Sequence, residues 1–206
     1  MSEKIERFFL QIKEMKFMFF IPMIVYYVFF PLCVFAYMQN PIGNVDTITV
    51  LSDISYSLVP IISVWWVFLF LREIVEGEGR EVLILGGGVS QIMGIFYGLH
   101  SICMIPVFFV LDDSDGSVMS LYLQMLVVSF FMYGLVYFLC VVLENIVIPI
   151  LLTMIYSIYA TTTSEELSLL QFEKMNNVDW MSGAIPFLLL GIILWIVGHK
   201  GIKRFR

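Results

Sequence analysis

Apolar residues in this chain gather into six long stretches that contain no Asp, Glu, Lys or Arg. A run of about 18 or more such residues is typical of a membrane-spanning helix, and at about 1.5 Å per residue each stretch is long enough, or nearly so, to cross. The pattern predicts an all-α membrane protein with six transmembrane helices in a single transmembrane domain over residues 1–206. The predicted spans run from Phe17 to Met38, Ile54 to Leu71, Leu83 to Leu111, Met119 to Leu143, Ile146 to Thr161 and Gly183 to Gly198.

The residues before the first span have an amphipathic pattern. Charged side chains are spread over the remaining faces of a helix whose apolar side holds Ile5, Phe8, Phe9, Ile12 and Met15. Residues 1–16 are therefore predicted to form a helix lying in the inner membrane interface. Two interpretations stay open for it, an ordinary anchor beside the first span and a docking surface for a partner.

Charge differs between the two predicted sides of the membrane. Only 14% of the residues are charged and 60% are hydrophobic, whereas a soluble domain carries about a quarter charged residues. With the N-terminus in the cytosol, Lys174 alone of the 11 basic residues faces outward, as the positive-inside rule favours. Both termini are thus predicted to be cytoplasmic. The acidic outer loops argue against nucleic acid as a partner. The inward basic residues are Lys4, Arg7, Lys13, Lys16, Arg72, Arg80, Lys200, Lys203, Arg204 and Arg206.

The outer segment before the last span, residues 162–182, begins with a helix-capping pattern. Thr163 is followed three residues later by Glu166, which is the arrangement of a capping box. Apolar residues at Leu167 and Leu170 follow. The segment is predicted to form a short amphipathic helix on the extracytoplasmic surface.

A row of small residues marks the third predicted span. Its members are spaced four apart, so they share one side of a helix and let another backbone approach closely. Such rows serve packing within one chain as well as dimerisation, and the partner helix stays open. The predicted helix-packing residues are Gly86, Ser90, Gly94 and Gly98.

Catalytic and cofactor motifs are missing from the sequence. No HExxH, G-x-S-x-G or Walker pattern occurs, and the glycine-rich stretch around Gly86 has no Gly-Lys-Ser/Thr ending. We therefore predict no catalytic residue, no cofactor, no metal site and no enzymatic activity in this chain. No predicted span contains Asp, Glu, Lys or Arg, and His100 is the one histidine inside a span. It is interpreted as a hydrogen-bond partner between helices or as a proton relay, and its role stays open.

A short charged segment, residues 72–82, separates the second and third predicted spans. Its charges force it into water or against a soluble protein, and the apolar Val82, Leu83 and Ile84 that follow suit a helix docked in a groove. A plain solvated loop is the alternative. The residues predicted to make contact with a partner are Arg72, Glu73, Glu76, Gly77, Glu78, Gly79, Arg80 and Glu81.

This charged segment resembles the coupling helix of type-2 ATP-binding-cassette exporter permeases. The pattern of that family is roughly Arg-Glu, then Glu-Gly-Thr, then Glu-x-Leu, and the chain matches it at Arg72-Glu73, Glu76-Gly77 and Glu81-Val82-Leu83. Glu78 stands in place of the threonine, and Gly79 adds a second glycine. The resemblance extends to the interfacial helix, the six spans, the outer helical segment and the basic tail.

The resemblance implies a transmembrane permease subunit of an ATP-driven exporter in the bacterial plasma membrane. Its partners would be a nucleotide-binding ATPase subunit, which hydrolyses ATP, a second permease chain, identical or related, and membrane lipid. A pathway lined by aromatic, Met and Leu side chains suits a peptide or another amphipathic cargo.

Three rival functions remain. The first is a non-transporting accessory, immunity or scaffold protein of the membrane. The second is a channel or carrier that works alone. The third is an intramembrane enzyme centred on His100.

Overall fold

The computed structural model describes residues 13, 15–39, 47–75, 88–109, 117–162 and 180–202. Across these ranges the chain is helical apart from short connections, and it contains no strand. The helices are η1 (Lys16–Phe20), α2 (Ile21–Ile24), η2 (Val25–Phe29), α3 (Phe30–Gln39), α4 (Thr47–Ser63), α5 (Trp65–Val75), α7 (Val89–Phe109), α8 (Ser117–Leu143), α9 (Val147–Thr162) and α10 (Trp180–Ile202). The predicted interfacial helix over residues 1–16 and the outer segment over residues 162–182 lie almost entirely outside the described residues.

Five helices are long and apolar enough to cross a membrane. The helix that corresponds to the predicted fifth span is shorter, with an apolar part over Val147–Ile158. The prediction of an all-α, membrane-embedded protein is confirmed, and the sixth crossing stays a prediction. The five candidate spans are Phe17–Ala36, Val50–Val75, Val89–Phe108, Val118–Leu143 and Ala184–Ile202.

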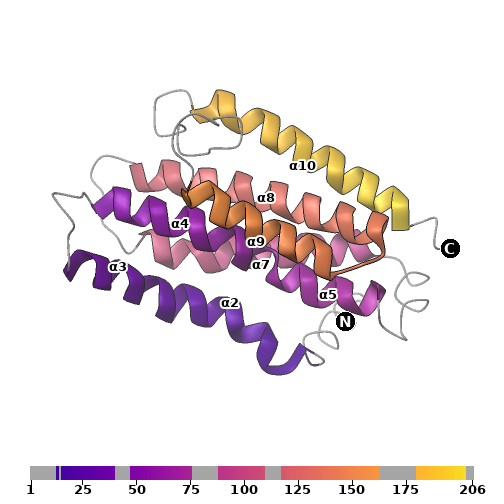
Figure 1. The fold of residues 1–206 in the computed structure, drawn as a ribbon, viewed down its shortest axis with the longest axis horizontal. Helices are drawn as coiled ribbons and strands as arrows, with labels where there is room; N and C mark the ends of the chain where they lie inside the picture. Colours follow the sequence, from indigo (N-terminus) through magenta and orange to yellow (C-terminus); the bar gives the residue numbers. More distant parts are fainter. Residues whose placement is uncertain are drawn as a thin grey trace.

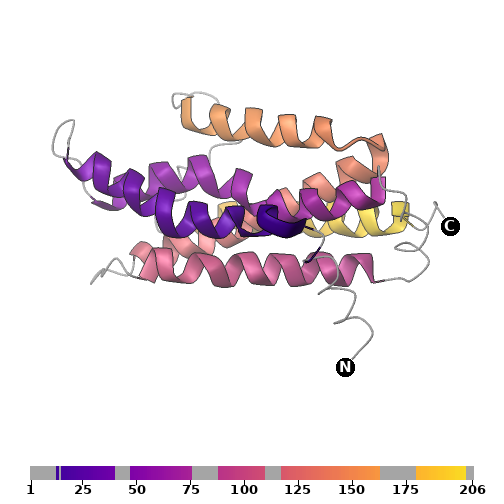
Figure 2. The same cartoon turned by 90° about the horizontal axis from the view of Figure 1, so that it is seen from below.

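The helices form a bundle around α8 and the α4–α5 pair. Of the candidate spans, these two have the largest buried share, whereas the one formed by α10 has the smallest. α8 contacts α10, α7, α5, α9 and α4. The first helix, η1 to α3, and α10 lie at opposite edges of the bundle (Figure 1), and α9 and α7 lie on opposite sides of it (Figure 2). α8 therefore holds α7, α9 and α10, whereas the first helix packs mainly on α4 and α7.

The outer surface of the bundle is covered by large apolar side chains. Leu32 and Phe35 on α3, Ile102 on α7, Ile155 on α9 and Ile193 on α10 are each more than half exposed. Contiguous apolar surface of this extent would be unfavourable in water and is typical of contact with membrane. The exposed faces thus agree with the length and composition of the helices in placing the bundle in a bilayer.

The first helix is interrupted around Pro22. A proline has no backbone N–H, so the α-helical bond from residue 22 to the Met18 carbonyl is missing, and that carbonyl accepts the Ile21 amide instead. Two indoles of α5 add hydrogen bonds at this point: Trp65 Nε1 donates to the Met18 carbonyl at 3.0 Å, and Trp66 Nε1 donates to the Phe19 carbonyl at 2.8 Å. A π-helical turn, η2, follows just before Pro31. The kink expected from proline is thus stabilised by hydrogen bonds from a neighbouring helix, as hydrocarbon surroundings require.

The second helix begins earlier than the sequence predicts. α4 begins at Thr47, so Asp53, which the prediction left in the loop, lies inside the helix with its side chain exposed. The polar residues of this turn are accommodated because their hydroxyls bond to the helix itself: Ser55 Oγ donates to the Leu51 carbonyl at 2.6 Å, and Ser57 Oγ donates to the Asp53 carbonyl at 2.9 Å. Such bonds let serines continue an apolar helix.

The closest helix contact joins α8 and α10. A Cβ atom on Gly134 would lie 2.6 Å from the Gly191 carbonyl oxygen, and one on Gly198 would lie 2.9 Å from the Tyr137 ring. Real Cβ atoms do not approach that closely, so these positions require glycine. Small residues at a helix interface are the usual device for close packing in membranes.

Candidate functional site

The charged segment emerges from a deeply packed helix. Arg72 and Glu73, its first residues, are exposed in the last turns of α5. The preceding residues are buried, and the rings of Trp66 and Phe70 lie 6.5 and 6.0 Å from the ring of Phe96 on α7. Of the other predicted contact residues, Glu76, Gly77, Glu78, Gly79, Arg80 and Glu81 lie outside the described residues.

The ends of several helices meet where α5 ends. Leu71 and Ile74 of α5 line one small cavity together with Val141 of α8, Glu144, and Ile202 of α10. Figure 1 shows the connection from α8 to α9 at the same end of the bundle. Any soluble partner that binds Arg72 and Glu73 would therefore also face the α8–α9 connection and the end of α10.

That connection is a tight one with its own helix cap. Glu144 adopts a left-handed conformation with φ 48°, and Asn145 Oδ1 accepts hydrogen bonds from the amides of Val147 and Ile148 at 2.8 and 3.1 Å. An Asn side chain in this position satisfies the free N–H groups of a helix start. The cap fixes the direction in which α9 leaves the end of α8.

The predicted row of small residues is only partly used inside the described chain. Ser90 Oγ accepts a hydrogen bond from Trp195 Nε1 on α10 at 2.7 Å. Gly94 and Gly98 face open space, because no described atom lies within 4 Å of where their Cβ atoms would be. Gly86 lies outside the described residues. The glycines that do make close contacts, Gly134 among them, are on α8 and α10, and no row spaced by four marks them in the sequence.

His100 lies at the centre of a polar cluster that joins three helices. Its side chain is fully buried. Nε2 lies 3.0 Å from Ser129 Oγ on α8, and Nδ1 lies 3.4 Å from the Tyr26 hydroxyl on η2. A neutral imidazole has one donor and one acceptor nitrogen, and hydroxyl groups at both positions serve either tautomer. The structure thus places His100 as an interhelical hydrogen-bond partner.

Two buried tyrosine hydroxyl groups of α8 have no hydrogen-bond partner among the described residues. Tyr133 and Tyr137 are fully buried on α8, and within the described part of the chain their OH groups make no hydrogen bond. The Tyr133 ring lies 6.2 Å from the His100 ring and 5.4 Å from the Tyr97 ring. The interior of the bundle around His100 is therefore aromatic and polar at once.

A second polar contact ties α4 to α8. The Tyr56 hydroxyl donates to Gln124 Oε1 at 2.7 Å, and Gln124 Nε2 donates to Ser120 Oγ at 3.3 Å. α4 is also tied to α9, because Ser157 Oγ donates to the Ser57 carbonyl. Sequence reasoning did not single out these residues. A glutamine in the middle of an apolar stretch was the signal that could have found the first contact.

Charged side chains are kept out of the interior of the described bundle. Its buried polar residues are Ser, Thr, Gln and His, without Asp, Glu, Lys or Arg. Among the described residues no three His, Cys, Asp or Glu side chains lie close enough together to hold a metal ion. The arrangement offers helix-to-helix hydrogen bonds inside and charge at the ends of the helices.

Comparison with protein families, characterised proteins and solved structures finds no match to this chain.

Proposed function

We propose that this protein is the transmembrane permease subunit of an ATP-driven exporter. It spans the bacterial plasma membrane six times with both termini in the cytosol, and it pairs with a second permease chain to enclose the pathway. A separate nucleotide-binding subunit hydrolyses ATP. The cargo is a peptide or another amphipathic molecule.

The observation that supports this proposal most is the position of Arg72 and Glu73 at the end of α5. α5 is buried against its neighbours, and Trp66 reaches both Phe96 on α7 and the Phe19 carbonyl on η1. A force applied to the charged segment by an ATPase would therefore act on the first helix and on α7 together. That mechanical continuity is what coupling between ATP binding and a change of helix arrangement needs.

The test is to purify the tagged chain from its native membrane in mild detergent and to assay ATPase activity in the preparation. We expect an ATPase subunit to co-purify. Glu76→Ala and Glu81→Ala should lower its recovery or uncouple its activity, because both carboxylates belong to the proposed contact. Asp53→Ala is the matched control: it removes an exposed carboxylate at the other end of the same Val50–Val75 span, away from the proposed contact.

Two results would contradict the proposal. If the chain elutes without any ATPase, a non-transporting accessory, immunity or scaffold protein becomes the better account. If vesicles containing only this chain show solute flux, a channel or carrier that works alone is favoured instead.

A further inference from the structure

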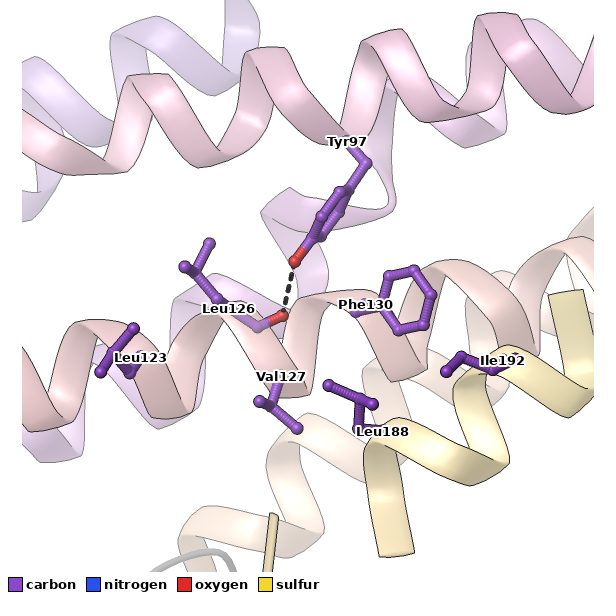
Figure 3. A pocket seen from close by; sticks show the side chains of 7 residues that line it. All are labelled: Tyr97, Leu123, Leu126, Val127, Phe130, Leu188 and Ile192. Carbon is purple, nitrogen blue, oxygen red and sulfur yellow. Dashed lines mark hydrogen bonds between the residues drawn. The ribbon is translucent and has the colours of Figure 1, made fainter. Parts of the chain in front are cut away.

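A groove lies between α7, α8 and α10 on the described bundle. Its volume is about 340 Å³. α10 is held close to α8 at Gly191 and Gly198. Toward the N-terminal end of α10 the two helices diverge (Figure 1), and this divergence opens the groove. It is lined by Tyr97, Leu123, Leu126, Val127, Phe130, Leu188 and Ile192 (Figure 3).

The lining offers no free polar side-chain group. Six of its seven residues are aliphatic or Phe, and the seventh, Tyr97, turns its hydroxyl to the Leu126 carbonyl at 3.1 Å (Figure 3). This bond uses the one polar side-chain atom of the groove. A headgroup, a sugar or a peptide backbone would find nothing there to replace its hydrogen bonds with water, whereas a hydrocarbon chain needs none.

The groove lies at the depth of lipid tails. The middle residues of α7, α8 and α10 are 99, 130 and 191 from their bounds. Every lining residue lies within seven residues of the middle of its helix, since Leu123 is the farthest. Seven residues correspond to about 10 Å along a helix, and the hydrocarbon core extends about 15 Å to either side of its centre. The groove therefore lies at the depth of the acyl chains and not at the depth of the lipid headgroups.

The groove has room for a stretch of hydrocarbon chain. Its volume of about 340 Å³ is roughly eleven times the 30 Å³ or so that one water molecule takes up in the liquid. A helix from a second copy of the chain is the alternative occupant, and the cross-linking outcome below distinguishes the two.

We propose that this groove is a binding site for one acyl chain of a membrane phospholipid. The chain lies between Tyr97 on α7, Val127 on α8 and Leu188 on α10, with the Phe130 ring beneath it. Phe130 is held in place by Trp195, whose ring stacks on it at 5.7 Å. The bound lipid thereby fills the space that the divergence of α10 leaves open. This inference requires only that the bundle lies in a membrane, so it stands apart from the proposed export function.

The experiment places the full-length chain in phosphatidylcholine vesicles that contain a phosphatidylcholine with a photoactivatable group in the middle of one acyl chain. After illumination, labelled residues are mapped by mass spectrometry. We expect several-fold more label on Val127, Leu188 and Ile192 than on Ile193, which lies on the outer face of α10 and is more than half exposed. Equal labelling of groove and outer face would overturn the proposal, as would a groove without label.

Filling the groove supplies the matched comparison. Leu188→Trp adds bulk inside it, and Leu189→Trp adds the same bulk to the neighbouring residue, which is 53% exposed and does not line it. The first variant should reduce label on Val127 several-fold, and the second should leave it unchanged. Val127→Phe fills the groove from α8 and serves as a second test in case the α10 variant does not fold. If a photoreactive amino acid in place of Val127 or Leu188 becomes cross-linked to a second copy of the chain, the lipid assignment is contradicted.

Discussion

α8 holds its two neighbours α10 and α7 in different ways. Toward α10 the backbones nearly touch, with the Cβ position of Gly134 only 2.6 Å from the Gly191 carbonyl oxygen. Toward α7 the contact runs through long polar side chains, from His100 to Ser129 and from Tyr97 to the Leu126 carbonyl. The first contact depends on shape and tolerates no added atom. The second depends on hydrogen bonds that can re-form after a shift, so α7 is the neighbour whose position can change with less loss of packing.

The largest effect is expected where an atom is added to the α8–α10 contact. Gly134→Ala forces the helices apart, because the new methyl group would overlap the Gly191 carbonyl. We expect a loss of about 1–3 kcal/mol in the free energy of unfolding, measured by denaturant titration in mild detergent. Unchanged stability would mean that α10 does not approach α8 at this point.

Removing a hydrogen bond from the α7–α8 contact should cost less. Ser129→Ala leaves His100 Nε2 without its partner at 3.0 Å, and we expect a loss of about 0.6–1.7 kcal/mol. Tyr133→Phe is the matched control, because it removes a buried hydroxyl from the same helix that has no hydrogen bond among the described residues. It should leave the stability unchanged or raise it. Equal losses in both variants would contradict the proposed role of the His100–Ser129 bond.

A still smaller loss is expected for the single polar bond described between α10 and α7. Ser90→Ala removes the 2.7 Å bond from Trp195 Nε1 while leaving the indole stacked on Phe130. The expected loss is about 0.6 kcal/mol. Trp195→Phe also removes packing, and combining it with Ser90→Ala should cost no more than Trp195→Phe alone if the two residues act only through each other. Additive losses would show that they act independently.

The smallest effect is expected at the open glycines of α7. Gly98→Ala should change the stability of the monomer by less than about 0.5 kcal/mol, because no described atom lies within 4 Å of the added methyl group. If Gly94 and Gly98 contact a second permease chain, Gly98→Leu should lower the dimer fraction in size-exclusion chromatography while the monomer stays folded. If Gly98→Ala destabilises the monomer, another part of this chain covers the face of α7 that holds Gly94 and Gly98.

The sequence predicts the apolar elements well and their mutual contacts poorly, for a physical reason. Long runs without charge identify helices that cross a membrane, because hydrocarbon excludes charge. α8 and α10 are apolar on all sides, so no amphipathic stripe shows which face packs inward. The small-residue row around Gly94 was visible from its spacing, yet Gly134 meets Gly191 only because α10, far away in sequence, lies beside α8.

Contacts between helices were easier to predict from the polar residues of the spans than from their apolar neighbours. His100 was singled out from the sequence as the one histidine in a span, and it proves to bridge α7, α8 and η2. Its partners Tyr26 and Ser129 could not be named, since each is one of many similar residues. Asp53 shows the opposite case: its charge suggested a loop, but an exposed position in the second turn of α4 accommodates it.

Whether residues 72–82 bind an ATPase subunit, as proposed, can be measured by site-specific photo-cross-linking in the native membrane. A photoreactive amino acid at Glu76 or Glu78 should capture a protein that contains a Walker motif, and the same probe at Glu166, on the opposite predicted side, should not. We expect an ATPase cross-link from the charged segment alone. Capture of no ATPase from either position of the charged segment would contradict it.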